Sequence, residues 1–204
     1  PGSVQGNELW KTDGTEAGTT LVKDISVGSG SSMNSLLGID LNGILIFTAF
    51  SQEFGREIWK TDGTTSGTTL LKDINPAQTS SYDNGIEYVK FNNEVYFLGY
   101  DDVNGKEIWK TDGTTSGTKI LKNINATADE ASSGIIKIYS DEVNNKLFFY
   151  ATDTNQNIPE LWVSDGTTSG TQKLSTIQIP DIYSPTNYFI TFKEHSYFSG
   201  KNDK

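Results

Sequence analysis

The chain has no cysteine, one histidine, one methionine and five prolines among its 204 residues. Without cysteine, disulfide bridges and thiolate metal sites are excluded. No run of about 18 apolar residues occurs, so a membrane-spanning helix is not expected. The Gly-x-Ser-x-Gly nucleophile motif is missing, and no glycine-rich loop opens a helix. Serine-hydrolase and phosphate-loop chemistry are therefore not predicted.

Basic residues are also scarce. The formal net charge is -10 and is spread along the whole chain, which is typical of a solvated acidic surface. Lysines recur singly inside predicted strands, at Lys11, Lys60 and Lys110, and form no basic stripe. Nucleic acid and anionic membrane surfaces are therefore not expected as partners, because both need clustered positive charge.

Most of the sequence consists of short apolar runs joined by polar turns. Thr, Ser, Asn, Asp and Gly are abundant, and Ile, Leu, Phe, Tyr and Trp occur in runs too short for a long helix. No segment with strand periodicity gives way to one with helical periodicity. The sequence predicts an all-β fold.

A repeat of about fifty residues dominates the chain. Glu8-Leu9-Trp10-Lys11-Thr12-Asp13-Gly14-Thr15 recurs three more times with few changes, and a second Gly-Thr follows each copy. The tryptophans lie 49, 50 and 53 residues apart, at Trp10, Trp59, Trp109 and Trp162. Repeats of this length are typical of propeller blades and stacked arrays.

Each copy is interpreted as four strands, most clearly in the third. The predicted strands there are 87–91, 94–100, 106–111 and 118–124, with a two-residue turn at Asn92-Asn93. A meander of four short strands is the size and order of a propeller blade.

The two ends of the chain carry half-units. The first copy begins at strand three, and the last stops after strand two, so together they would complete one blade. We predict a propeller-like domain over 4–204 with four blades of four antiparallel strands, the terminal blade closed by strands from both ends. The predicted parts are a half blade 4–27, blades 35–76, 86–126 and 134–178, and a half blade 186–204.

Two alternatives to the closed ring stay open. Two chains could form an eight-bladed ring, or the chain could be part of an open array of repeats. A monomer is favoured and a dimer is the alternative. Residues 1–3, Pro-Gly-Ser, are interpreted as an expression-tag remnant, with natural flanking sequence and any signal peptide removed.

The motif resembles the bacterial repeat family named for Glu-Leu-Trp-x-x-Asp-Gly-Thr, across all four copies. Copies two and three have Ile for Leu, and copy four has Ser164 for Thr. The resemblance implies a secreted or cell-surface bacterial protein, often carrying type IX secretion sorting domains, with an adhesive or recognition role and no defined ligand. The short Asp-containing hairpins are also similar to those of sialidase-type propellers, which are structural there.

The recurring polar and aromatic residues have a structural and a functional interpretation. Turn chemistry favours structure for the aspartates, each capping its own turn, over a ring of ligand or cation sites. The tryptophans are expected to pack between blades rather than to stack on sugar rings. The predicted structural signature comprises Trp10, Asp13, Trp59, Asp62, Trp109, Asp112, Trp162 and Asp165.

Candidate binding residues lie in the loops that differ between copies, because recognition usually resides in loops on a rigid frame. They are Tyr82, Asp101, Asp102, Asn104, Asp153, Asn155 and Tyr183. The oxygen-rich loops offer a possible calcium site at Asp101, Asn104, Asp153 and Asn155, although a solvated loop is favoured. No other cofactor is expected.

We expect a non-catalytic recognition or adhesion module, extracellular on a bacterial surface, binding glycan or protein on a cell surface through its loop rim. The lone His195 lies in a turn without a cysteine or nucleophile motif, so no catalytic residue is assigned. A first alternative is a structural spacer repeat of a giant surface protein. A second is a glycosidase-like propeller enzyme with paired carboxylates.

Overall fold

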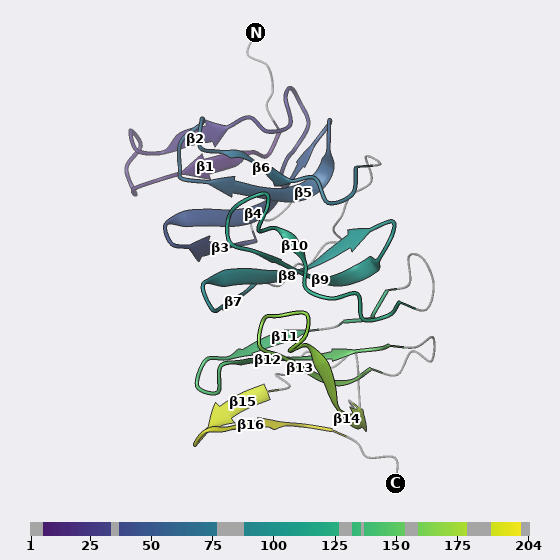
Figure 1. Ribbon diagram of the computed structural model, residues 1–204. Coiled ribbons are helices and arrows are strands. Elements are labelled where there is room, and N and C mark those ends of the chain that lie inside the picture. The colour runs from purple at the N-terminus through teal and green to yellow at the C-terminus, as the bar shows by residue number, and fades with distance from the viewer. Residues whose placement is uncertain are drawn as a thin grey trace. The chain divides into compact units, whose positions relative to one another are not determined.

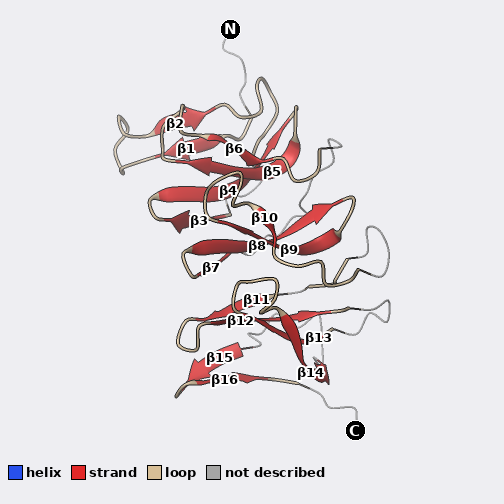
Figure 2. Ribbon diagram, in the orientation of Figure 1, coloured by secondary structure: helices blue, strands red, loops and turns tan. Residues whose placement is uncertain are grey.

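The computed structural model describes residues 6–33, 37–76, 88–126, 132–135, 137–153, 159–178 and 189–200. All regular elements in this part of the chain are strands (Figure 2). None of the described residues belongs to a helix long and apolar enough to cross a membrane. The prediction of an all-β fold is confirmed.

Three copies of the repeat each form a four-stranded antiparallel sheet in sequence order (Figure 1). Copy two contributes β3 Gly38–Leu41, β4 Ile44–Ser51, β5 Gly55–Thr61 and β6 Thr69–Lys72. Copy three contributes β7 Val89–Phe91, β8 Glu94–Asp101, β9 Gly105–Thr111 and β10 Lys119–Ile120. Copy four contributes β11 Ile138–Asp141, β12 Lys146–Ala151, β13 Glu160–Ser164 and β14 Gln172–Gln178. This is the blade layout of a propeller-like fold.

The half-units form hairpins of their own. The first copy has β1 Leu9–Lys11 and β2 Thr20–Lys23, and the last half-unit has β15 Phe189–Phe192 and β16 His195–Phe198. Each pair is described as a separate two-stranded sheet. The two hairpins belong to different compact units of the chain, so the blade made from both ends stays a prediction.

Tight turns join strands one and two of most copies. Asn92 and Asn93 have φ of 49° and 61°, the left-handed conformation that a two-residue hairpin turn needs, as predicted from their sequence. Lys193 and Glu194 take the same conformation in the last half-unit, with φ of 47° and 63°.

The chain divides into two compact units, residues 1–86 with 111–118, and residues 87–110 with 119–204. The first unit has a core around Phe47, Ala49 and Trp59, which pack with Leu9 and Val22 of the first copy. The second has a core built from copies three and four, including Phe91, Tyr96, Ile138, Leu147, Phe149 and Trp162.

Candidate functional site

The most regular polar feature is the turn between strands three and four of each copy. We call these the signature turns; they span 12–19, 61–68, 111–118 and 164–171. In the second, Asp62 Oδ1 accepts bonds from Thr64 N and Thr64 Oγ1 at 2.8 and 2.7 Å. The Thr64 hydroxyl in turn accepts from Gly67 N at 2.9 Å. The aspartate is thus bonded within its own turn, which is the geometry of a turn cap.

The threonines at the two ends of the signature turn close it. Thr61 Oγ1 lies 2.6 Å from Thr68 Oγ1 and accepts from Gly63 N at 2.9 Å. In copy four Ser164 replaces the first threonine, and its hydroxyl makes the equivalent contact to Thr171 Oγ1 at 2.7 Å. The change from Thr to Ser therefore keeps the group that the turn uses.

The spacing from Asp to the second Gly is set by close packing. A Cβ on Gly67 would lie 2.0 Å from Asp62 Oδ1, and the equivalent glycines of the other copies are equally close to their aspartates. Bonds from the threonine hydroxyl and N–H lower the pKa of Asp62 below its ordinary value, and the same bonds lower the pKa of Asp13 and Asp165. The carboxylate is held in its charged form by the turn itself.

Each signature turn after the first also binds the copy that precedes it. The strand-three lysine donates to the carbonyl of the Asp-Gly-Thr glycine in the next copy. The pairs are Lys11 to Gly63 at 2.8 Å, Lys60 to Gly113 at 2.9 Å and Lys110 to Gly166 at 2.9 Å. These lysines lie in the signature motif itself, so the motif connects copies as well as shaping turns.

Two further bonds accompany each of these contacts. The strand-four lysine donates to the carbonyl of the last threonine in the next signature turn, and a threonine in that turn donates back to a strand-four carbonyl. In the middle joint these are Lys72 to Thr118 O at 2.8 Å and Thr115 Oγ1 to Leu71 O at 2.9 Å. The other two joints repeat them with Lys23, Thr65, Lys122 and Thr168. We call this set of three bonds the joint.

Copy one lacks the threonine that a joint takes from the signature turn, and copy four lacks the two lysines that a joint takes from strands three and four. Glu16 stands in copy one where the other signature turns have the donating threonine. Val163 stands in copy four where the other copies have the strand-three lysine, and Ser175 takes the place of the strand-four lysine in the sequence.

The glutamate of the motif fixes the segment that follows strand four. Ile25 N and Ser32 N donate to Glu8 at 2.8 and 3.1 Å, and Ile74 N donates to Glu57 at 3.0 Å. Glu107 accepts from Ile124 N and Asn125 N at 3.2 and 3.3 Å. Burial raises the pKa of Glu107 to about 7. This buried carboxyl bonds the segment after strand four to strand three of its own copy.

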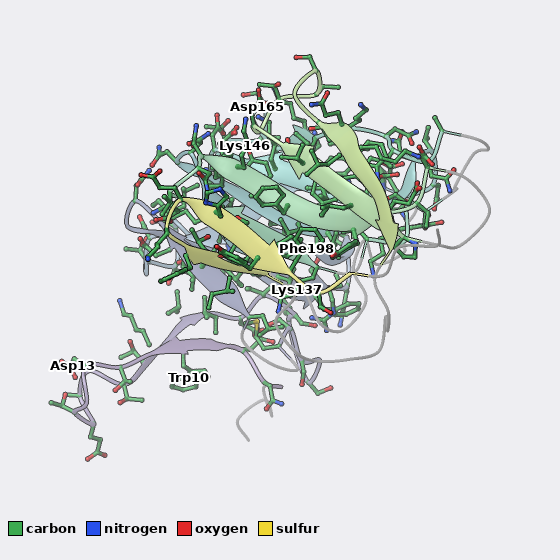
Figure 3. The ribbon with its side chains drawn as sticks, turned by 90° about the horizontal axis from the view of Figure 1, so that it is seen from below. Trp10, Asp13, Lys137, Lys146, Asp165 and Phe198 are labelled. Carbon is green, nitrogen blue, oxygen red and sulfur yellow. The ribbon has the colours of Figure 1, made fainter. Side chains whose placement is uncertain are left out.

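The tryptophans of the complete sheets are buried. Trp59, Trp109 and Trp162 are 5–6% exposed, and Trp162 stacks on Phe149 with ring centroids 6.4 Å apart. Trp10 is different, with 54% of its surface exposed (Figure 3). It lies on β1, which among the described strands pairs with β2 in a two-stranded sheet.

Some of the predicted binding residues are hydrogen-bonded or paired to neighbouring residues of the chain, and others lie outside the described residues. Asp101 Oδ1 accepts from Val103 N and Asn104 N at 2.8 and 2.6 Å, and Asn104 Nδ2 donates to Asp101 Oδ2 at 2.9 Å. Asp102 is exposed on the same turn. Lys173 binds Asp153 at 2.8 Å, which raises the pKa of the lysine. Tyr82, Asn155 and Tyr183 lie outside the described residues.

The possible calcium site stays a prediction. The described part of the chain contains no group of three or more acidic or histidine side chains placed to hold a metal ion. Both carboxylate oxygens of Asp101 accept from Asn104 within their own turn, and Asn104 Oδ1 accepts from Asn123 Nδ2 at 3.0 Å. His195 is exposed, with Nδ1 2.9 Å from Lys193 O.

Sequence reasoning missed the joints. It placed Lys11, Lys60 and Lys110 singly in strands and gave them no role. The signal was present, because an unpaired lysine at one fixed position of three successive copies is unusual unless it meets a fixed partner. The partner is a backbone carbonyl, which leaves no trace in the amino-acid sequence.

No family model matches the chain, and no curated protein is similar to it in sequence. Among solved structures, it is similar to an α-L-arabinofuranosidase from Clostridium thermocellum, with TM-score 0.32 and 15% identity over 79% of each chain. It is also similar to a candidate exo-β-1,3-galactanase from Bifidobacterium bifidum, with TM-score 0.38 and 12% identity over 84% of this chain and 64% of that one.

These comparisons correct one prediction. We expected a non-catalytic recognition or adhesion module, but the solved structures named above are glycosidases and stand nearer to the glycosidase-like alternative. The prediction of a recognition or adhesion module is therefore withdrawn. Likeness at this level concerns fold alone and assigns no activity to this chain.

Proposed function

We propose that this chain is a structural repeat domain whose blades are fastened to one another by the signature turns. The observation that carries the proposal is the joint. Lysine and threonine side chains of each copy bond to backbone carbonyls of the neighbouring copy, at 2.6–2.9 Å in three successive joints. The residues that recur most strictly are thus used for cohesion.

The chemistry of the recurring carboxylates supports the same conclusion. The aspartates cap turns, and the buried glutamates Glu8, Glu57 and Glu107 accept backbone N–H groups. A glycosidase needs an acid and a second carboxylate that both reach a substrate. The motif aspartates Asp13, Asp62, Asp112 and Asp165 are bonded within their own turns instead, Glu8, Glu57 and Glu107 accept from backbone N–H groups, and Glu160 is paired with Lys173.

The resemblance to the Glu-Leu-Trp-x-x-Asp-Gly-Thr family suggests in which kind of protein such a structural domain would occur. A spacer built from such repeats would extend a secreted or cell-surface protein, with stability contributed by each repeat and each joint. In that role the chain would catalyse no reaction, and its acidic surface would keep it in solution.

Single-molecule pulling on the two ends of the chain tests the proposal. Lys60→Met removes one joint bond and is expected to lower the unfolding force of its unit, whereas Lys119→Met, at an exposed position of β10, leaves the force unchanged. Equal forces for both variants would show that the joints bear no load.

A panel of chromogenic arabinofuranosides and galactosides separates the structural proposal from an enzymatic one. No hydrolysis above the rate with heat-denatured protein is expected. Turnover that survives repurification and is abolished by a carboxylate substitution would overturn the structural proposal.

A further inference from the structure

The joint between copies three and four contains a carboxylate beside its lysine. Lys110 Nζ donates to Gly166 O of copy four at 2.9 Å and also lies 2.9 Å from Glu94 Oε2 of its own copy. Glu94 begins β8 and Lys110 lies on β9, and these strands are neighbours in one sheet (Figure 1). Their side chains are 24% and 14% exposed, so water screens the pair only in part. The lysine that reaches copy four is therefore held by copy three as well.

A buried tyrosine completes this group. Tyr96 Oη donates to the same oxygen of Glu94 at 2.9 Å, and Tyr96 is 0% exposed. Burial and the neighbouring Glu94 carboxylate raise the pKa of the Tyr96 phenol far above its ordinary value, so the hydroxyl keeps its proton. Both bonds to Glu94 Oε2 are charge-assisted, because the acceptor is a carboxylate. Glu94 is thus fixed by a donor from each side.

The same tyrosine lies against the signature turn of copy four. A Cβ on Gly166 would lie 2.5 Å from Tyr96 Oη and 3.5 Å from Phe91 Cε1. Phe91 and Tyr96 contact edge to face, with ring centroids 5.9 Å apart. Gly166 is buried, whereas the equivalent Gly63 and Gly113 are half-buried. The acceptor carbonyl of this joint therefore belongs to a residue that the partners of Lys110 also cover.

The middle joint differs at both positions. Ile44 and Ile46 stand in copy two where copy three has the glutamate and the tyrosine. Among the described residues, Lys60 donates to Gly113 O at 2.9 Å and has no carboxylate partner. The atom nearest to a Cβ on Gly113 would be Leu41 Cδ2, at 3.6 Å. The two joints thus use the same lysine bond in different surroundings.

Ordering a lysine is costly, because its long stem samples many rotamers when the ammonium group has no partner. In the middle joint, Lys60 loses this freedom when it binds the carbonyl of the next copy. In copy three the bond to Glu94 already restricts Lys110, and Tyr96 restricts Glu94. Less freedom remains to be lost when Lys110 binds copy four, so the bond is more favourable.

We propose that Glu94 and Tyr96 are positioning residues that hold Lys110 toward copy four and thereby strengthen this joint. Glu94 acts through its bond to the ammonium group, and Tyr96 acts through Glu94. The inference rests on the joints of the proposed function and adds what holds one of their donors in place. The middle joint lies inside the first compact unit and this joint inside the second, so the two units report on the two joints separately.

Exchange of the lysine ammonium protons with water tests the positioning directly. Nitrogen-edited NMR detects ammonium groups whose protons exchange slowly, and Lys110→Met and Lys60→Met identify the two signals. Glu94→Gln removes the charge and keeps the shape, so exchange at Lys110 should become about tenfold faster while Lys60 is unchanged. Tyr96→Phe removes one hydroxyl and should give a smaller increase. Unchanged exchange at Lys110 in the Glu94→Gln chain would overturn the proposal.

A double-mutant cycle distinguishes positioning of the lysine from a role of Glu94 in folding alone. Glu94→Gln is expected to accelerate unfolding about fivefold in the wild-type chain and to give no acceleration in a Lys110→Met background. Glu142→Gln is the control, because Glu142 is an exposed glutamate of the same unit. Equal acceleration in both backgrounds would show that Glu94 acts without the lysine.

Single-molecule pulling separates the failure of this proposal from the failure of the structural one. Glu94→Gln should lower the unfolding force of the second unit only, and Lys60→Met that of the first unit only. If Lys60→Met and Lys110→Met leave both forces unchanged, the joints bear no load and the structural proposal fails. If both lysine variants lower the force while Glu94→Gln changes neither force nor exchange at Lys110, the positioning role alone is wrong.

Discussion

Residues of the signature turn depend on one another over seven positions. Thr61 and Thr68 close its base, Asp62 and Thr64 brace its interior, and Gly67 leaves room for the aspartate. Each side chain thus satisfies a donor or acceptor that would otherwise be unpaired. The strict recurrence of this pattern has a local cause.

Replacing Gly67 tests that interdependence. Gly67→Ala places a Cβ where Asp62 lies, so we expect the carboxylate to be displaced and about 1–2 kcal/mol of unfolding free energy to be lost. In an Asp62→Ala background the same substitution should cost much less. Urea unfolding of the four proteins in this cycle measures the coupling. Equal costs in both backgrounds would mean that the alanine acts through the backbone.

Burial of Glu107 predicts a pH dependence. Its pKa is raised to about 7 in the folded chain, so the folded state holds a proton that the unfolded state releases above the ordinary value of 4.5. The stabilisation is complete below that ordinary value and is lost as the pH rises through about 7. Glu107→Gln cannot ionise and keeps a carbonyl for Ile124 N and Asn125 N.

We therefore expect Glu107→Gln to gain about 1–3 kcal/mol relative to wild type on going from about pH 5 to about pH 8. Chemical denaturation at the two pH values provides the measurement. Glu160→Gln is the control, because the equivalent Glu160 is paired with Lys173 at 2.7 Å in a partly exposed site. A Glu107→Gln effect independent of pH would contradict the proposed titration.

At the scale of elements, strands three and four of one copy are bonded to the signature turn of the next copy. The middle joint combines Lys60 to Gly113 O, Lys72 to Thr118 O and Thr115 Oγ1 to Leu71 O. Lysine stems cover apolar surface while their ammonium groups reach carbonyls, so each joint adds packing as well as charge-assisted bonds.

The free-energy costs of two substitutions in the middle joint are expected not to be additive. Lys60→Met and Thr115→Val are each expected to cost about 0.5–1.5 kcal/mol, because each leaves one carbonyl without its donor. Together they should cost less than the sum, since either loss loosens the same turn. Thermal unfolding of the single and double variants measures this. Strict additivity would show that the bonds act independently.

For the whole molecule, the negative charge governs how two chains meet in solution. Each chain carries a formal charge of -10, so two chains repel each other. Salt screens this repulsion, with a Debye length of about 10 Å at about 0.1 M.

Much of the architecture could be predicted from the amino-acid pattern. Recurrence of Trp10, Trp59, Trp109 and Trp162 revealed the units, and alternation of strand and turn residues located most strands to within two residues. These features are local, because turn conformation and strand propensity depend on neighbouring residues. The predicted strand over 118–124 is shorter in the structure, where β10 covers Lys119–Ile120.

The sequence by itself determined the repeats, the strands and the turn chemistry, since each follows from residues a few positions apart. Only the tertiary structure decided the partners of the lysines, the burial of Glu107 and the exposure of Trp10. A lysine that meets a carbonyl some fifty residues away, as Lys60 meets Gly113, pairs with backbone that every residue type shares. Such contacts are invisible until the copies are placed against each other.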